Sequence, residues 1–424
     1  MSRIIFFAIL IGFFLLLDLI AYSGLKSIIK DIKKAQLRKG LRILALAASI
    51  TKILAVFILV IVYGFNYREF QGVAAISNVL LFIILIPQLI FVIIMLTEDV
   101  FRFGEWILKK LNLIGSKAEA DGETSGNGME GRRKFVTQLG LGIAAVPFLG
   151  VMHGVTRGKY AFTVRNVTLK IPELPKAFHG FKLAQISDIH SGSFDDPEKV
   201  YKGIELVNEQ KADLIAFTGD LVNNKATEIE PWIDAFKVLN APFGKYSILG
   251  NHDYGHYVSW PSKQDEIDNL NRLKENHAKM GFQLLQNENR ILEKDGDKIA
   301  LLGVENWGKG GFPKFGDLDQ AMLGAEDMPV KVLLSHDPSH WDQKVLEHKQ
   351  KIHLTLSGHT HGMQFGIEIP GIKWSPVKYR YPRWAGLYQE AEQYLYVNRG
   401  FGFLAFPGRV GIWPEVTVIE LQQA

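Results

Sequence analysis

The sequence predicts an α/β domain preceded by a helical transmembrane region, and three observations lead to this fold class. Apolar runs occupy residues 4–20, 41–65 and 73–96, and each approaches or exceeds the roughly 20 residues that cross a bilayer as a helix. The C-terminal part instead alternates short β-type runs with polar, helix-like segments such as residues 197–210 and 264–280, as α/β domains do. The length of 424 residues leaves room for both parts.

The first 115 residues are expected to form a membrane region with about three transmembrane helices. The chain is 47% hydrophobic with a mean hydropathy of +0.06, and the apolar excess lies in this region. One such run could be a buried helix of a soluble protein, but three in succession argue against that. The basic segments 26–42 and 102–110 are predicted to be cytoplasmic under the positive-inside rule. Asp18 is interpreted as a residue near the inner end of the first helix, where it can reach the interface.

Residues 116–134 are expected to be a flexible linker because they are rich in Gly, Ser and acidic residues. Arg132 and Arg133 precede a moderately apolar segment, residues 135–155. This segment can be a fourth membrane helix or a twin-arginine-like export leader. Both interpretations place everything after Gly150 outside the cytoplasm.

Composition limits the cofactors and partners of the chain. The absence of cysteine excludes a thiolate zinc site and agrees, weakly, with an oxidising compartment. The C-terminal part has no run of Lys and Arg interleaved with aromatic residues, so nucleic acid is not an expected partner. The net charge of +4 says little, because much of the basic excess belongs to the cytoplasmic loops.

Five β-type runs are each followed by an acid, an amide or an imidazole. The ligand crevice of an α/β sheet lies at the carboxyl ends of its strands, so we expect these side chains to converge. One such residue is usually structural, but five coincident cases point to a site. Carboxylates with imidazoles and an amide are a ligand set for Mn, Fe or Zn. In chain order the residues are Asp188 and His190, Asp220, Asn251 with His252 and Asp253, His336, and His359 with His361.

Read in order, the motifs D-x-H, G-D, G-N-H-D, a lone H and G-H-x-H resemble the calcineurin-like metallophosphoesterase superfamily. The segments "LYVNRGFG" and "WPEVTVIEL" are similar to its bacterial, membrane-associated branch. The resemblance implies a four-layer α-β-β-α sandwich as the catalytic domain, in residues 160–424.

The resemblance also implies two divalent metal ions (Mn, Fe or Zn) and a role for each motif residue. His252 would act beside the metals on the phosphoryl oxygen or the leaving group, and Asp253 would fix its tautomer, unless Asp253 is a turn cap. Arg399 and Arg409 could meet an anionic substrate or form structural salt bridges. The first metal is expected on Asp188, His190 and His361, the second on Asn251, His336 and His359, with Asp220 bridging them.

The leading hypothesis is a membrane-anchored, dinuclear-metal phosphoesterase that uses a metal-bound hydroxide. It is expected to be a multi-pass protein of the bacterial inner membrane with an extracytoplasmic catalytic domain. Its expected partners are a phosphoester substrate, for which a lipid-linked or cell-envelope compound would suit the tether, and the lipid bilayer. Two alternatives stay open: a membrane scaffold or sensor with a structural or regulatory metal centre, and a nuclease or protein phosphatase.

Overall fold

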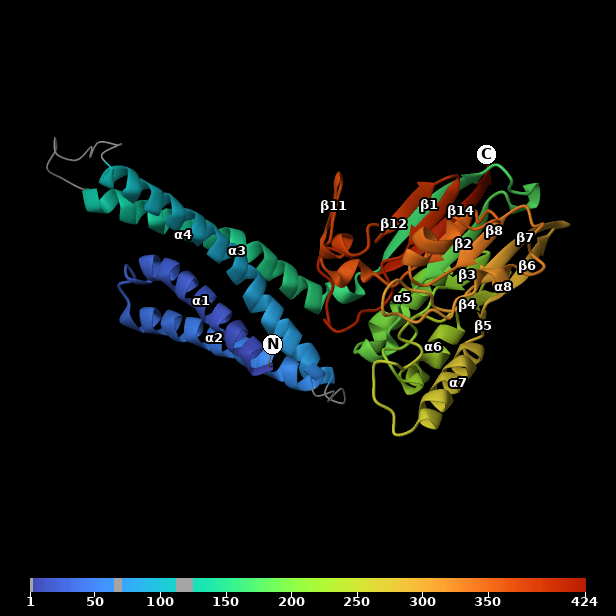
Figure 1. Cartoon of the computed structure of the whole chain (residues 1–424), viewed down its shortest axis with the longest axis horizontal. Helices are drawn as coiled ribbons and strands as arrows, with labels where there is room; N and C mark the ends of the chain where they lie inside the picture. The colour runs from blue at the N-terminus through green and yellow to red at the C-terminus, as the bar shows by residue number, and fades with distance from the viewer. Residues whose placement is uncertain (1–2, 65–70, 112–124) are drawn as a thin grey trace. The chain divides into compact units, whose positions relative to one another are not determined.

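The structure is a computed structural model that describes residues 3–64, 71–111 and 125–424. It separates into two compact units, Met1–His153 and Gly154–Ala424. Among the described residues, the first unit is helical and the strands belong to the second, as Figure 1 shows by colour along the chain. Each unit is described by itself below.

Within the described residues of the chain, four helices are long and apolar enough to cross a membrane. They are α1 Arg3–Ile29, α2 Ala35–Gly64, α3 Gln71–Lys110 and α4 Ser125–Thr156. The first three contain the apolar runs predicted from the sequence. The basic side chains predicted to flank the fourth are paired, because Arg132 bonds Glu98 and Glu105 while Arg133 bonds Asp99.

Helix α4 begins inside the segment predicted to be a flexible linker. Residues 116–124 lie outside the described residues, but residues 125–134 are helical and continue into the apolar segment. The expectation of a flexible linker up to residue 134 is therefore wrong for its last ten residues. The ion pairs of Arg132 and Arg133 with helix α3 give this polar end a reason to stay helical, which composition alone does not reveal.

A polar cluster joins three helices of the first unit. The Lys52 side chain is completely buried, and its Nζ donates to Asp18 Oδ1 at 2.7 Å and to Gln88 Oε1 at 2.8 Å. Gln88 Nε2 in turn donates to the same Asp18 oxygen at 2.7 Å. Asp18 is thus an interhelical partner of Lys52, and its interpretation as a helix-end residue is wrong. Charges among apolar helices are retained where they pair in this way.

The described second unit contains two six-stranded sheets and a separate hairpin. The first sheet has the order β1 Thr163–Ile171, β14 Glu415–Gln423, β2 Phe181–Ile186, β3 Leu214–Phe217, β4 Lys245–Ser247 and β5 Gln283–Leu284. The second has the order β12 Gly386–Glu390, β13 Gln393–Val397, β9 Leu354–Ser357, β8 Lys331–Leu334, β7 Asp297–Gly303 and β6 Glu288–Lys294. In the first sheet, β2 to β5 run parallel and β14 is antiparallel to β2. In the second, β7, β8, β9 and β13 run parallel between the antiparallel edge strands β6 and β12.

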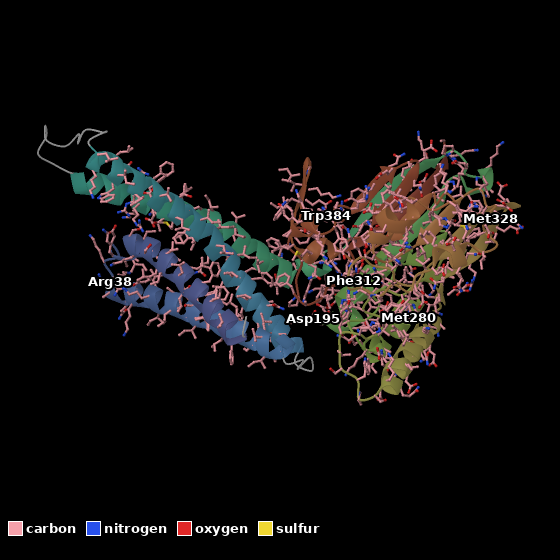
Figure 2. The ribbon with its side chains drawn as sticks, viewed as in Figure 1. Arg38, Asp195, Met280, Phe312, Met328 and Trp384 are labelled. Carbon is pink, nitrogen blue, oxygen red and sulfur yellow. The ribbon has the colours of Figure 1, made fainter. Side chains whose placement is uncertain are left out.

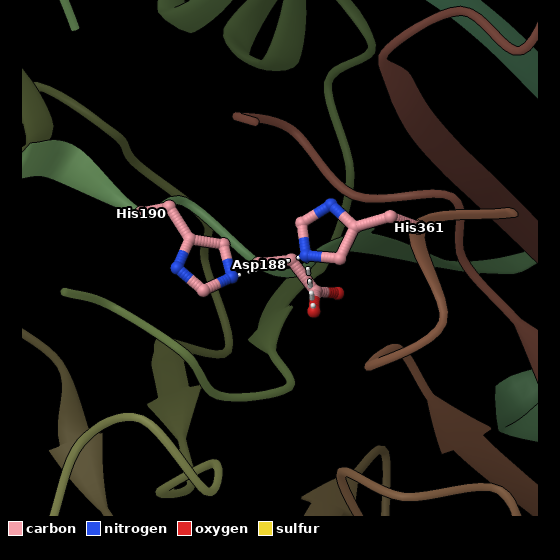
Figure 3. Close-up of side chains that lie close together, drawn as sticks. All are labelled: Asp188, His190 and His361. Carbon is pink, nitrogen blue, oxygen red and sulfur yellow. Dashed lines mark hydrogen bonds and ion pairs between the residues drawn. The ribbon is translucent and has the colours of Figure 1, made fainter. Parts of the chain in front are cut away.

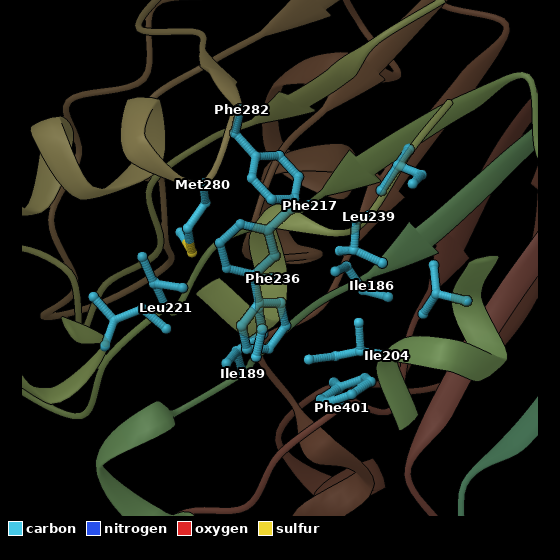
Figure 4. Packing of buried hydrophobic residues seen from close by; sticks show 14 of the residues in the cluster. Ile186, Ile189, Ile204, Phe217, Leu221, Phe236, Leu239, Met280, Phe282 and Phe401 are labelled. Carbon is cyan, nitrogen blue, oxygen red and sulfur yellow. The ribbon is translucent and has the colours of Figure 1, made fainter. Parts of the chain in front are cut away.

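Three apolar cores make this unit a four-layer sandwich. The central core lies between the sheets, where Leu183 and Leu214 share one cluster with Leu301 and Leu356. An outer core packs helices α5 Pro197–Glu209, α6 Ile233–Lys237 and α7 Lys263–Lys279 on the first sheet (Figure 4). The other packs α8 Leu318–Met322 and the π-helical turn Trp341–Val345 on the second sheet. The predicted four-layer fold and both predicted helices are confirmed.

Short elements connect these layers. The hairpin consists of β10 Ile367–Ile369 and β11 Ile372–Trp374. A small apolar cluster beside it contains Trp384, which Figure 2 labels. The 3-10 turns are Gly158–Tyr160, Lys176–Phe178, Ser191–Ser193, Ala226–Glu228, Glu230–Trp232, His361–Gln364 and Pro376–Tyr379.

Candidate metal centre

The candidate site lies where five parallel strands of the two sheets end. The first sheet supplies residues after β2, β3 and β4, and the second supplies residues after β8 and β9. The convergence expected from the sequence is confirmed, because these side chains lie 2.7–3.5 Å from one another. The residues are Asp188 and His190 after β2, Asp220 after β3, Asn251 after β4, His336 after β8, and His359 and His361 after β9.

The backbone of this site is strained. Five of its non-glycine residues have φ between +45° and +70°, in the left-handed region that side chains disfavour. They are Asp188, His190, Asp220, His359 and His361. The preceding glycines allow the loops to approach closely: a Cβ on Gly358 would lie 2.3 Å from Asp188 Oδ2. Strain of this kind persists where the surrounding structure holds the residue for a function.

Asp188, His190 and His361 form the first cluster (Figure 3). His361 Nε2 lies 3.0 Å from His190 Nε2 and 3.2 Å from Asp188 Oδ1, and all three side chains are buried. The backbone N–H of His359 donates to Asp188 at 2.9 Å, which links this cluster to the next loop. Two imidazole nitrogens and a carboxylate oxygen therefore face one another in a buried site.

Asp220, His336 and His359 form the second cluster. Asp220 Oδ2 lies 3.2 Å from His336 Nε2 and also 3.5 Å from His190 Nε2 of the first cluster. Its carboxylate thus stands between the two clusters. Asn251 joins the second one, because its Oδ1 lies 2.7 Å from His359 Nδ1.

The donor set fits two divalent cations. Within each cluster the candidate ligand atoms lie within 4.8 Å of one another, as they must to share one ion. Among the described residues, the buried Nε2 of His336 makes no hydrogen bond of good geometry, and Asp220 Oδ2, 3.2 Å away, is its ion-pair partner. A buried ring nitrogen without such a bond requires an explanation, and a cation between His336 and Asp220 would supply one.

The protonation of these groups favours ligation at three positions and opposes it at His336. Burial lowers the pKa of His190 and of His359, so both rings are neutral and have a free lone pair near neutral pH. Burial opposes ionisation of Asp188, but His361 outweighs it and the pKa of Asp188 is lowered. Burial likewise opposes protonation of His336, yet the Asp220 carboxylate raises the pKa of His336 to about 10. A cation at the second cluster would have to displace that proton.

Several supporting residues carried little or no signal in the sequence. Tyr381 Oη lies 2.8 Å from His359 Nε2, and Asp337 Oδ2 lies 3.4 Å from the same nitrogen. His336 Nδ1 faces the carbonyl oxygen of Thr218 at 2.7 Å. Such outer partners fix ring orientation and tautomer. Asp337 could have been suspected because it follows His336 directly, whereas Tyr381 is 20 residues beyond the last motif.

His252 lies beside the clusters, but Asp253 does not orient it. The His252 ring is 5.0 Å from that of His190, and its Nδ1 contacts the carbonyl oxygen of Asn223 at 2.7 Å. Burial lowers the pKa of His252. The partner expected to fix its tautomer is therefore a backbone carbonyl, which has no side-chain signature in the sequence.

The buried Asp253 carboxylate instead accepts four backbone N–H groups. Gly250 and Asp220 donate to Oδ2 at 2.8 and 2.9 Å, and Leu221 and Val222 donate to Oδ1 at 2.8 and 3.3 Å. This arrangement is closer to the turn-cap alternative. Asp253 ties together the two loops that carry Asp220 and Asn251.

The two arginines considered as substrate contacts are structural. Arg399 forms ion pairs with Glu415 and Glu368, each at 2.6 Å. Arg409 is fully buried and donates to backbone carbonyls, and its guanidinium also lies 3.3 Å from His361 Nδ1. The salt-bridge alternative is confirmed for Arg399.

Two family models match the chain. The one described as "Probable Calcineurin-like phosphoesterase, transmembrane domain" matches residues 2–159, and "Calcineurin-like phosphoesterase" matches residues 181–363. The first match includes α4, in agreement with a fourth membrane helix. The second includes every candidate ligand named above.

Curated relatives carry names of the same kind. Uncharacterized metallophosphoesterase YkuE of Bacillus subtilis (strain 168) is 33% identical over 258 residues, which are 60% of this chain and 84% of the relative. "Transmembrane protein with metallophosphoesterase domain" of Danio rerio is 28% identical over 68% of this chain and 63% of its own length. Phosphodiesterase YaeI of Escherichia coli (strain K12) is 26% identical over 69% of this chain and all of its own length.

Proposed function

Because the chain belongs to the calcineurin-like phosphoesterase family, we propose that its two clusters hold a pair of divalent metal ions for hydrolysis of a phosphoester outside the cytoplasm. The protein is a membrane-linked phosphoesterase and a metal-dependent phosphoric ester hydrolase. The observation that carries the dinuclear proposal is the position of Asp220 Oδ2, within 3.5 Å of a histidine nitrogen of each cluster.

Each side chain has a distinct part in this proposal. When bound, a pair of Mn, Fe or Zn ions supplies Lewis acidity that activates water and offsets phosphoryl charge. Asn251 would present its Oδ1, since its Nδ2 donates to the Tyr257 hydroxyl at 2.9 Å and fixes the amide orientation. The first ion would be held by Asp188, His190 and His361, the second by Asn251, His336 and His359, and both by Asp220.

His252 would handle the proton of the leaving group. Its Nδ1–H donates to the Asn223 carbonyl, which leaves Nε2 for the substrate. A proton on Nε2 can stabilise a phosphoryl oxygen or pass to the departing alkoxide. The lowered pKa of His252 leaves the ring neutral near neutral pH, so Nε2 would first take up a proton, for example from the water that is activated, and then pass it to the leaving alkoxide. Asp253 is a positioning residue in this proposal, because it shapes the loops of Asp220 and Asn251.

The placement of the catalytic unit is proposed from charge. The basic segments 26–42 and 102–110 would lie in the cytoplasm, so the chain would leave the bacterial inner membrane on the outer side at the end of α4. A lipid-linked or cell-envelope phosphoester would suit an active site that is tethered there. Protease accessibility in sealed, oriented vesicles tests the placement, and turnover restricted to soluble nucleotides would contradict the substrate class.

The central experiment measures hydrolysis of bis-p-nitrophenyl phosphate and p-nitrophenyl phosphate. The detergent-purified chain is stripped with a chelator and refilled with Mn, Zn or Fe. We expect metal-dependent turnover that is lost in Asn251→Ala and His252→Ala, whereas His179→Ala, which replaces an exposed histidine, retains it. Of the two inactive variants, only His252→Ala should keep its full metal content.

Two results would contradict the proposal. Turnover that survives complete metal removal would exclude the dinuclear mechanism, and unchanged turnover in His252→Ala would exclude its role. Two bound metals without turnover of monoesters, diesters or lipid-linked esters would favour the sensor alternative.

A further inference from the structure

The hairpin β10–β11 exposes its apolar face and turns its polar face towards the catalytic unit. In its register Ile369 pairs with Ile372 and Ile367 pairs with Trp374, so these four side chains share one face. The three isoleucines are between 49% and 56% exposed. An apolar face that points away from its own domain marks an interaction surface.

The opposite, polar face is the one that packs on the catalytic unit. Glu368 pairs with Arg399 at 2.6 Å and with Arg165 at 2.9 Å. Lys373, its cross-strand neighbour, donates to the carbonyl of Ala385. These contacts fix the orientation of the hairpin, so the isoleucines cannot turn inward without breaking buried ion pairs. The hairpin stands clear of both large sheets (Figure 1).

The base of the hairpin is tied to the end of the last apolar helix. Gly366 N–H donates to Val410 at 2.9 Å, Val410 N–H donates to Gln364 at 2.8 Å, and Arg409 N–H donates to Gly154 at 3.1 Å. Gly154 lies inside the candidate membrane span Gly131–Thr156. The exposed isoleucines thus arise from a segment that is hydrogen-bonded near the C-terminal end of this candidate span.

The segment that follows has the composition of a membrane interface. Lys378 and Arg380 are exposed, and Tyr379 between them is 77% exposed. Aromatic and basic residues gather at the headgroup layer, where the ring is partly buried and the cation meets lipid phosphate. The exposed isoleucines, the basic and aromatic flank and the hydrogen bond to Gly154 therefore indicate the lipid bilayer as the occupant.

We propose that the hairpin β10–β11 dips its isoleucine face into the outer leaflet of the bilayer that anchors the chain. The chain from His361 to Tyr381 contains the hairpin, and its two ends are a candidate ligand and the hydroxyl that contacts His359. Docking therefore holds the mouth of the metal centre at the lipid headgroups. The choice of the outer leaflet rests on the placement proposed above, whereas the lipid contact itself would hold whatever the site hydrolyses.

The absence of native cysteine permits a direct test. Ile369→Cys and Ile372→Cys are labelled separately with the fluorophore NBD in the full chain, reconstituted in nanodiscs of phosphatidylethanolamine and phosphatidylglycerol. The control is Leu323→Cys, because Leu323 is 68% exposed in the same unit but remote in sequence from the hairpin. Nitroxide-bearing lipid and aqueous iodide serve as the two quenchers.

We expect the hairpin labels to emit at shorter wavelength, to lose most of their emission to nitroxide lipid, and to resist iodide. The label at residue 323 should behave in the opposite way. Adding Ile372→Asp should return the label at residue 369 to water. Hairpin labels quenched by iodide as strongly as the control would overturn the proposal, and labels shielded from both quenchers would overturn it in favour of a protein partner.

Discussion

Replacing Asp253 with asparagine should destabilise the catalytic unit before it affects any chemical step. The carboxylate accepts four buried backbone N–H groups, two on each oxygen. Asparagine keeps one oxygen, so two N–H groups would face an amide NH2 and lose their acceptor. A buried donor without a partner costs about 1–3 kcal/mol, which sums to about 2–6 kcal/mol for the pair.

That loss should be visible in thermal unfolding. For a unit of this size, about 2–4 °C are lost per kcal/mol, so we expect Tm to fall on the order of 10 °C. Metal content should fall too, because the loops of Asp220 and Asn251 lose their common acceptor. The assay combines near-UV circular dichroism melts, elemental analysis of bound metal and turnover of bis-p-nitrophenyl phosphate.

Asp213→Asn is the matched control. Asp213 also accepts a backbone N–H, from Lys182 at 2.8 Å, but with one oxygen that asparagine retains. Asp213→Asn should change the free energy of unfolding by less than about 1 kcal/mol, and its Tm should therefore stay close to that of the wild type. The reasoning is refuted if Asp253→Asn melts like the wild type and keeps both metals while turnover disappears. That result would restore Asp253 as the residue that orients His252.

The other predictions concern acid stability, the membrane bundle and the metal loops. Burial lowers the pKa of His277 from 6.5 to about 3, so the folded state binds fewer protons than the unfolded state between these two pH values. The free energy of unfolding therefore falls by about 1.4 kcal/mol for each pH unit below pH 6.5, down to about pH 3. His277→Phe should flatten the dependence of Tm on pH in this window, and an unchanged slope would count against this reasoning. Lys52→Met should lower the free energy of unfolding by about 3–5 kcal/mol because the Asp18 charge loses its partner. The double variant with Asp18→Asn should recover most of this loss in thermal melts in detergent, and equal stability of the single variant and the wild type would contradict the prediction. Gly358→Ala should weaken Mn binding on the order of tenfold because Asp188 must move, which titration calorimetry can check against the wild type.

The sequence predicted the site residues that directly follow a strand in the chain. A β-type run followed by Gly and an acid or histidine is a local pattern, and parallel strands bring such ends to one edge of a sheet. Asp188, Asp220 and His336 could therefore be expected to meet although they are far apart in sequence. Their meeting is confirmed by distance, whereas their role as metal ligands stays a prediction. The four-layer arrangement came from the resemblance rather than from periodicity.

The features that escaped prediction depend on partners without a local pattern. The acceptor of His252 is the backbone carbonyl of Asn223, and any residue type could provide it. Tyr381 reaches His359 only because the segment that follows the hairpin returns to the strand ends. Lys52 pairs with Asp18 through the relative rotation of two helices, which a hydropathy pattern does not specify.

The left-handed backbone at five candidate ligand positions limits how this centre can change during evolution or engineering. Residues other than Gly, Asn, Asp and His lose about 1–2 kcal/mol in that conformation. An exchange of Asp188 or Asp220 for glutamate, or of His359 for cysteine, would meet this backbone penalty in addition to any misfit at the ion. Substitutions among Asp, Asn and His meet a smaller penalty, because these residues adopt the left-handed region more readily than other non-glycine residues. The main chain thereby favours oxygen and imidazole donors at this site. Its metal preference can be changed by exchanges among Asp, Asn and His more readily than by introducing cysteine ligands.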